Sequence, residues 1–460
     1  MKIEFHGADR TVTGSCHLIE CAGQRVVIDC GLAQGGREAD ARNRANFAFD
    51  PARIDAVLLT HAHADHCGRL PLLYKRGFTG RIFCTAATAE LARVVLLDSA
   101  HLQEEDALRH AARPGVVPGR AAQALYTLAD AQHCANHFDP SAVYGTAHEL
   151  APGIRVTFFE AGHILGSASL FVELEEEGRR RTVAFSGDLG NLGRPLLAPP
   201  VLPPRADVAV LETTYGDRQH KPIDASVEEL YHAVAATLAR GGNVVIPTFA
   251  LERAQEILWY LRQGWHEGRL QGLEHVFLDS PMAISATEIF ARHVECLQPA
   301  IARQIRAGTD PFQLPGIAFT RAAADSRTIN RFTCGTVILA GAGMCNGGRV
   351  LYHLQRNLPR PECAVIFVGF AARGTLARRI IDGVRRVRIL QEDVAVRAAI
   401  HTINGFSAHA DQRELLAWHR RVHPGLTFLV HGEEAAMQAL APLLRGGRVE
   451  MPAQGQVFEI

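Results

Sequence analysis

One six-residue stretch, His61-Ala-His63-Ala-Asp65-His66, limits what this chain can fold into more than any other feature. It places four good metal ligands directly after the apolar residues 56–59. Alternate side chains of an extended backbone point to the same face, so His61 and His63 can hold one ion. Asp65 and His66, after a turn, can reach a second ion. Imidazole and carboxylate suit zinc, and iron or manganese less specifically. The alternative is a His-rich surface loop that binds metal by accident.

Composition narrows the class of protein. The chain has 460 residues, of which 47% are hydrophobic, so it can bury large cores and is too long for one ordinary domain. Its formal net charge is zero, so any polyanion must bind a local patch. The ten cysteines include no C-x-x-C pair, residues 1–5 lack the apolar character of a signal peptide, and no apolar run is long enough to cross a bilayer. We therefore expect a cytoplasmic protein without a membrane partner.

The hydrophobic pattern changes near residue 208. Before it, short strands separated by glycine-containing turns predict a sheet sandwich with outer helices at residues 87–113 and 128–138. These strands are expected at residues 2–5, 16–21, 26–30, 56–60, 81–84, 154–160, 168–174 and 182–186. After it, alternating strands and helices predict a second, doubly wound domain with parallel strands at residues 208–212, 244–247, 276–279, 337–340 and 364–368. The proline-rich residues 198–204 mark the boundary.

A dinuclear site needs roughly six or seven protein ligands, and three further candidates share one setting. His163 lies between Gly162 and Gly166, and glycine permits close approach of the backbone to a metal. Asp188 follows an apolar strand, where a carboxylate can bridge two cations about 3.5–4 Å apart. His431 ends another apolar run and precedes a glycine. Each alone is better explained as a hydrogen-bonded structural residue, but their common setting favours a metal site.

Taken in order, these residues resemble the metallo-β-lactamase superfamily: an H-x-H-x-D-H cluster, then a lone His, a lone Asp and a late His. Asp29 is similar to the family's first motif, whose Asp supports the cluster by hydrogen bonding and binds no metal itself. Three further positions resemble motifs A, B and C of the β-CASP branch of nucleic-acid-processing nucleases, namely Glu212, His409 and His431. Similar segments at residues 247–256, 279–283 and 341–344 extend the resemblance over nearly the whole chain.

The resemblance implies an α/β fold in which a metallo-β-lactamase αββα sandwich carries an inserted β-CASP domain of doubly wound, mainly parallel type. The sandwich is expected to comprise residues 1–205 and a return segment, residues 388–460, with the insert at residues 206–387. The implied relatives are bacterial and archaeal RNA-processing enzymes and, more distantly, the endonuclease subunit of the eukaryotic pre-mRNA cleavage machinery. Substrate held between two domains suits an unpaired strand better than a duplex.

The same resemblance implies a zinc-dependent ribonuclease with two Zn²⁺ per chain, Mn²⁺ being the alternative. One ion is expected on His61, His63 and His163, the other on Asp65, His66 and His431, with Asp188 as a bridge. Two cations that share a water molecule lower its pKa enough to provide a hydroxide that attacks phosphorus. Asp65 and Asp188, which are expected to hold these cations, are therefore also expected to be catalytic residues. The departing 3′ oxygen needs a proton, which we expect from His409, oriented and kept protonated by Glu212. Products would carry a 5′-phosphate and a 3′-OH.

Single-stranded RNA is the expected partner, because a His at position 431 accompanies RNA-directed relatives where DNA-directed ones usually carry Val. Endonucleolytic cleavage is the first expectation and 5′-exonucleolytic trimming the second, and relatives indicate a homodimer. Candidate RNA contacts are Ser407, Arg253, Arg349, Arg373 and Gly343. Arg373 begins a basic stretch, and Gly343 lies in a glycine-rich segment that could present N–H groups to a phosphate.

Each basic residue is equally well explained as part of a solvated helix face. Three other functions also stay open: a DNA nuclease of the same family, a small-ester metallohydrolase, and a non-catalytic RNA-processing subunit.

Overall fold

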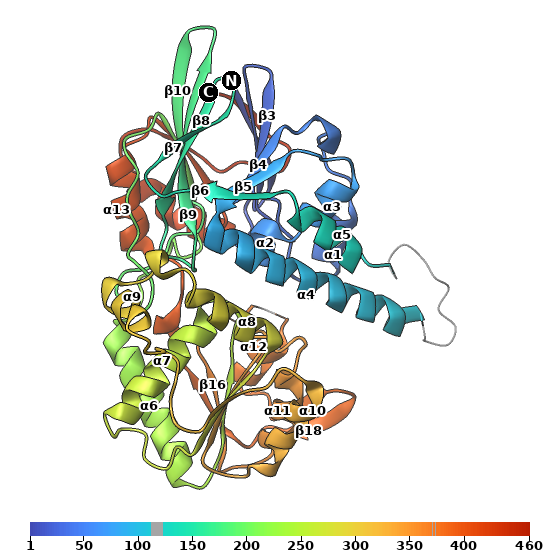
Figure 1. The fold of residues 1–460 in the computed structure, drawn as a ribbon, viewed down its shortest axis with the longest axis vertical. Coiled ribbons are helices and arrows are strands. Elements are labelled where there is room, and N and C mark those ends of the chain that lie inside the picture. Colours follow the sequence, from blue (N-terminus) through green and yellow to red (C-terminus); the bar gives the residue numbers. More distant parts are fainter. Residues whose placement is uncertain (112–122, 370, 373) are drawn as a thin grey trace. The chain divides into compact units, whose positions relative to one another are not determined.

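The protein, described here by a computed structural model of residues 1–111, 123–369, 371–372 and 374–460, contains two compact units. The first unit consists of Met1–Leu192, Leu197–Gln219 and His409–Ile460, and the second of Gly193–Leu196 and His220–Ala408 (Figure 1). The main limits therefore fall at residues 220 and 408, later than the expected 206 and 387. Strand β11 (Val208–Glu212) belongs to a sheet of the first unit, and β19 (Ala399–Thr402) to the sheet of the second.

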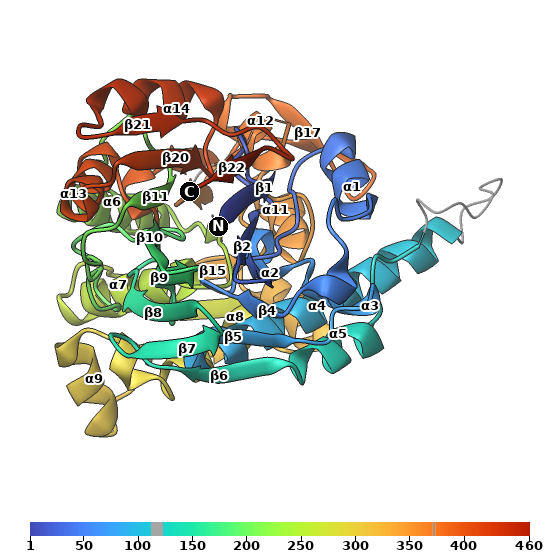
Figure 2. The ribbon, with the colours of Figure 1, turned by 90° about the horizontal axis from the view of Figure 1, so that it is seen from above.

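Two seven-stranded sheets form the first unit (Figure 2). In spatial order, one contains β22 (Val457–Glu459), β1 (Lys2–Gly7), β2 (Cys16–Cys21), β3 (Gln24–Ile28), β4 (Ala56–Leu58), β5 (Arg81–Thr85) and β6 (Phe138–Ala142). The other contains β21 (Arg448–Glu450), β20 (Leu426–Val430), β11, β10 (Arg179–Phe185), β9 (Ala168–Glu176), β8 (Ile154–Glu160) and β7 (Ala147–Ala151). Because alternate strand residues point inward, side chains such as Phe5, Phe158 and Phe428 build one core shared by both sheets.

Helices pack against both sheets of the sandwich. The long α4 (Ala86–Ala111) contacts β5 and β6, and also α5 (Leu128–Ala135), which in turn contacts α3 (Leu70–Lys75). Helix α13 (Gln412–Val422) begins with a capping box formed by Asp411 and Glu414. Its Leu415 and Trp418 pack with Leu211 of β11 and with residues of α14 (Glu434–Leu440). The predicted αββα sandwich is confirmed.

The second unit is built on one six-stranded parallel sheet. Its order is β14 (Ile317–Phe319), β13 (His275–Asp279), β15 (Thr336–Ala340), β12 (Val244–Pro247), β16 (Ala364–Phe367) and β19. The helices of this unit are α6 (Ile223–Ala239), α7 (Arg253–His266), α8 (Pro281–Phe290), α9 (Pro299–Arg306), α10 (Ala323–Thr328), α11 (Val350–Asn357) and α12 (Leu376–Ile381). A hairpin of β17 (Arg386–Ile389) and β18 (Glu392–Ala395) completes it. This parallel architecture confirms the doubly wound prediction.

The sequence-based assignments need three corrections. Residues 208–212 do form a parallel strand, but it pairs with β10 and β20 in the sandwich and not with the second sheet. The helix expected at 128–138 ends at Ala135, and Phe138 already begins β6. The strand expected at 26–30 ends at Ile28, because Asp29 adopts a left-handed backbone with φ +58°. Within the described residues, no helix is long and apolar enough to span a membrane.

Candidate metal centre

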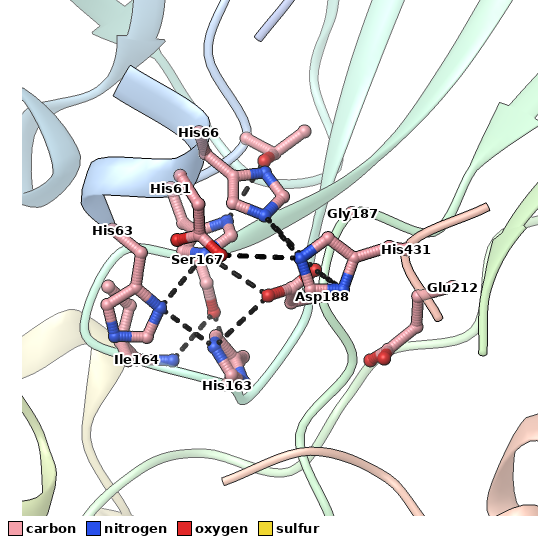
Figure 3. A network of polar contacts seen from close by, with 12 residues as sticks. His61, His63, His66, His163, Ile164, Ser167, Gly187, Asp188, Glu212 and His431 are labelled. Atoms are coloured by element: carbon pink, nitrogen blue, oxygen red, sulfur yellow. Dashed lines mark hydrogen bonds and ion pairs between the residues drawn. The ribbon is translucent and has the colours of Figure 1, made fainter. Parts of the chain in front are cut away.

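The four candidate ligands of the H-x-H-x-D-H stretch lie where β4 leads into the short helix α2 (Ala64–Cys67). His61 and His63 are in the extended link, and Asp65 and His66 are on the helix. The chain brings three residues from other strand ends to the same place: His163 after β8, Asp188 after β10 and His431 after β20 (Figure 3). All seven expected ligands therefore lie in the first unit.

The first group of donor atoms belongs to His61, His63, His163 and Asp188. His63 Nδ1 lies 3.1 Å from His61 Nε2 and 3.1 Å from His163 Nε2. Asp188 Oδ2 is 3.5 Å from the same His61 nitrogen and 3.6 Å from that of His163. Tetrahedral zinc with ligands at about 2.0–2.1 Å has ligand–ligand edges of roughly 3.3 Å. The spacing of these four atoms suits one such ion.

The second group belongs to Asp65, His66 and His431. His431 Nε2 lies 3.2 Å from His66 Nε2 and 3.5 Å from Asp65 Oδ2. The other carboxylate oxygen of Asp188, Oδ1, faces this group, at 3.3 Å from His66 Nε2 and 3.5 Å from His431 Nδ1. The two oxygens of one buried carboxylate thus face different groups, as a carboxylate bridging two cations would.

Hydrogen bonds from outside the cluster orient its imidazoles. Asp29 Oδ2 lies 2.8 Å from His66 Nδ1, and the Asp29 carboxylate also accepts from the Thr60 N–H and hydroxyl, each at 2.8 Å. Thr60 Oγ1 is 3.0 Å from His61 Nδ1, and Thr214 Oγ1 is 3.1 Å from His431 Nδ1. Contacts at Nδ1 of His61 and His66 leave Nε2 directed at the site. The sequence analysis identified Asp29 but missed both threonines, although Thr60 directly precedes His61 and Thr214 lies two residues after Glu212.

Glycines allow the backbones around the cluster to come close together. A Cβ at Gly31 would lie 1.6 Å from the Asp65 carbonyl oxygen, so only glycine fits there. Gly162, directly before His163, has φ +66°. Two residues that are not glycine, Asp29 and His431, also have left-handed backbones, at φ +58° and +50°. Such strain is typical of functional sites that the surrounding structure holds in place.

Burial and charge set the protonation of the cluster. Burial lowers the pKa of His63 to about 4 and holds the pKa values of His61 and His163 well below their usual range. Burial alone would also lower the pKa of His66, but Asp188 and Asp29 raise it. Neutral imidazole and ionised carboxylate are the forms that bind metal. Several buried imidazole nitrogens and carboxylate oxygens that converge at this spacing can be satisfied together by a cation, so the residues present fit a metal site.

His409 and Glu212 form a separate pair beside the cluster. His409 Nδ1 lies 3.2 Å from Glu212 Oε2 and 3.4 Å from Oε1, and its ring centre is 4.5 Å from that of His163. Glu212 Oε1 also accepts the N–H of Leu189, at 2.6 Å. Burial alone would lower the pKa of His409, but the Glu212 carboxylate, with Asp188, raises it to about 9. The pair is built to keep an imidazole protonated near neutral pH.

Four of the five candidate RNA contacts lie outside this cluster, and three of these four are engaged within the protein. Arg253 is buried and paired with Glu256. Arg349 Nη1 donates to Asp279 Oδ1 and to the Thr320 carbonyl oxygen, each at 2.7 Å. Ser407 is buried, and its carbonyl oxygen accepts from Arg194 at 2.8 Å. Gly343 lines a hollow of the second unit, and Arg373 lies outside the described residues. RNA binding by these five residues stays a prediction.

Comparison with protein families gives three matches along the chain. Residues 9–248 match the metallo-β-lactamase superfamily, and residues 254–380 match the Beta-Casp domain. Residues 393–452 match a domain described as the Zn-dependent metallo-hydrolase RNA specificity domain, which includes both His409 and His431.

Individual proteins resemble the chain over most of its length. Ribonuclease TTHA0252 of Thermus thermophilus is 42% identical over 458 residues, 99% of each chain. Transcription termination factor FttA of Methanocaldococcus jannaschii is 31% identical over 97% of this chain and 69% of its own. An RNase J-like protein of the same archaeon is 29% identical, covering 94% and 92%. Among solved structures, a protein of unknown function from Enterococcus faecalis V583 covers 99% of both chains with a TM-score of 0.55 and 11% identity, a likeness of fold alone.

Proposed function

Because the chain belongs to the metallo-β-lactamase superfamily and carries its Beta-Casp and RNA specificity domains, we propose that it is a zinc-dependent ribonuclease that hydrolyses phosphodiester bonds of single-stranded RNA. Three of its relatives bear the names ribonuclease, RNase J-like protein and transcription termination factor. One observation carries the proposal: the buried Glu212 carboxylate pairs with His409 at the edge of the seven-donor cluster. Such a pair can supply the proton that phosphodiester cleavage requires for its alkoxide leaving group.

Two zinc ions are the proposed complement, one on each donor group, with Asp188 shared. When bound, the ions would supply a nucleophile from water near neutral pH and offset charge on the phosphoryl oxygens. Asp29, Thr60 and Thr214 would hold the ligating imidazoles in position through the hydrogen bonds described above. Mn²⁺ is the alternative metal, because carboxylate and imidazole ligands bind it as well.

His409 is the proposed general acid, and it gives up its proton to the departing 3′ oxygen. Glu212 orients the ring through Nδ1, which leaves Nε2 as the atom that faces substrate. Cleavage in this way leaves a 5′-phosphate and a 3′-OH and does not require the ribose 2′-OH. Internal cleavage is the proposed mode.

The test uses zinc-loaded protein with internally labelled single-stranded RNA and a DNA of the same sequence, with and without chelator. We expect chelator-sensitive RNA fragments with 5′-phosphate ends, and intact DNA. Their sizes distinguish internal cutting from stepwise trimming. Intact RNA despite a full complement of metal would overturn the proposal.

A substitution tests the general acid directly. His409→Ala should slow cleavage by roughly 10²- to 10⁴-fold, the usual contribution of such a group, and leave metal content unchanged. His101→Ala is the matched control, because the His101 side chain is 62% exposed on α4 and should have no role. Equal rates for the two variants would remove His409 from this role.

A further inference from the structure

A small hollow on the second unit carries an aromatic ring at its surface. Phe249 is 40% exposed there, whereas Phe367 and Val368, which also line the hollow, are buried. Arg253, Gly343 and Gly369 also line the hollow. Single exposed phenylalanines are common on proteins, so exposure alone decides nothing. Phe249 is distinguished by its position in the sheet, by the glycine backbone that contacts its ring and by its neighbours.

The hollow lies at a change of direction in the parallel sheet. Strands β12 and β16 are neighbours in the order β14-β13-β15-β12-β16-β19. From the carboxyl end of β12 the chain leads to β13 on one side, and from that of β16 it leads to β19 on the other. Connections that diverge in this way leave a crevice at the carboxyl edge, which is where open α/β sheets bind ligands. Phe249 follows β12, and Gly369 follows β16.

The connection that carries Phe249 is held in place on both sides. The Thr248 N–H donates to the Ala340 carbonyl oxygen at 3.1 Å. The buried Gln255 amide donates to the carbonyl oxygens of Ala250, at 3.2 Å, and Ala283, at 3.1 Å. Glu252 adopts a left-handed backbone with φ +64°. An aromatic ring on a rigid connection loses little conformational entropy when a ligand packs on it.

Glycine backbones support the ring. A Cβ at Gly343 would lie 3.1 Å from Cδ2 and Cε2 of Phe249, and a Cβ at Gly369 would lie 3.7 Å from Cε2. The ring therefore rests against backbone that has no side chain to cover it. The Arg253 side chain, whose charge is paired with Glu256, also lines the hollow. A flat exposed aromatic face suits the face of a nucleotide base better than an aliphatic ligand.

We propose that Phe249 is a stacking platform for one unpaired base of the bound RNA strand. The inference rests on the proposed ribonuclease function and adds to it a binding residue in the second unit. The hollow is too small to enclose a base, so it offers only a face. Stacking on an exposed ring is possible for every base type, because each base has a flat face.

The test measures RNA binding by fluorescence anisotropy in zinc-loaded protein carrying His409→Ala, which is slow to cleave. Adding Phe249→Ala should weaken binding by roughly 5- to 150-fold, the usual range for loss of one base–aromatic stack. Phe249→Trp should restore it, and Phe249→Leu, which keeps an apolar side chain, should not. Phe319→Ala is the matched control, because Phe319 in β14 is also 40% exposed and lies outside the hollow. Thermal unfolding checks that the variants fold alike.

A scan of RNAs, each with one abasic nucleotide, gives an independent readout. In the parent protein, removal of one base should weaken binding at a single position of the strand, and Phe249→Ala should abolish that dependence. The slope of affinity against salt concentration should stay unchanged, because stacking releases no counterions. If Phe249→Ala binds like its parent, or the scan looks the same in both, the stacking role is wrong while RNA cleavage stands. If the wild-type protein neither binds nor cleaves RNA, both proposals fail.

Discussion

At the scale of single residues, the cluster depends on side chains that hold its ligands in position. Asp29 is the clearest case, because its carboxylate contacts His66 Nδ1 and receives two hydrogen bonds from Thr60. Asp29→Asn removes the charge that orients this imidazole. We expect zinc affinity to fall by roughly 10- to 100-fold, as measured by competition with a chromophoric chelator.

The control for this substitution is Asp106→Asn, because the Asp106 side chain is 70% exposed on α4 and should not affect zinc. Equal zinc affinities for the two variants would show that Asp29 does not support the metal centre.

Glu212 provides a prediction about pH. A general acid acts only while protonated, so activity falls as pH rises through its pKa. Burial alone lowers the pKa of His409, whereas Glu212 and Asp188 raise it to about 9. Glu212→Gln removes one of these charges and keeps an acceptor for the Leu189 N–H. The alkaline limb of kcat/KM against pH should therefore move to lower pH. A limb that stays in place would show that it does not report His409.

The candidate ligand residues were the features most easily predicted from sequence. Each of His163, Asp188 and His431 follows an apolar strand, and the structure brings all three to the H-x-H-x-D-H stretch. Thr60 and Thr214 could not be found in this way, because a threonine after a strand is common and only its partner shows its role. Arg349 shows that a sequence also cannot reveal whether a basic residue is available to RNA, since its guanidinium donates to Asp279 and to the Thr320 carbonyl oxygen.

At the scale of elements, the turn after β3 must pass very close to α2. The Cys30 N–H donates to the His66 carbonyl oxygen at 2.7 Å, and a Cβ at Gly31 would overlap the Asp65 carbonyl. Gly31→Ala should displace Asp65 and His66, lower zinc affinity, and reduce the free energy of unfolding by roughly 1–3 kcal/mol. Chelator competition and denaturant titration measure the two effects.

Gly36→Ala is the matched control for that turn, because a Cβ at Gly36 would meet nothing within 4 Å. It should leave both quantities unchanged. A Gly31 variant with normal zinc affinity would mean that the helix can shift without moving its ligands.

Strand β11 shows why elements are easier to predict than their partners. Its apolar run correctly predicts a central parallel strand, and in the structure all of its residues are buried. An apolar run of this kind fits either sheet, so the pattern cannot say which one takes it. Pairing with β10 and β20 places Glu212 at the strand end beside His409. The assignment of one strand therefore decides whether the proposed acid has its carboxylate.

At the scale of the whole molecule, two compact units with separate cores contain different parts of the proposed function. All seven proposed ligands lie in the first unit. A ligand that binds only the folded state stabilises it by about 4 kcal/mol at a thousand times its Kd. Chelation should therefore lower the thermal midpoint of the first unit and leave that of the second unchanged.

Differential scanning calorimetry with and without chelator measures this effect. Re-addition of Zn²⁺ is the control and should restore the higher midpoint. A single transition that shifts as a whole would show that the units unfold together. Absence of any shift would argue against metal in the cluster.

From the sequence alone we could predict the chemistry available and the class of each element: which residues are candidate metal ligands, where apolar strands lie, and that the second sheet is parallel. These properties are local, since ligand type and hydrophobic period are encoded within a few residues. The folded chain was needed to see that Asp188 faces both donor groups and that Glu212 meets His409 across 197 residues of sequence. Such pairings depend on packing free energy summed over whole cores, to which no single segment contributes enough to be decisive.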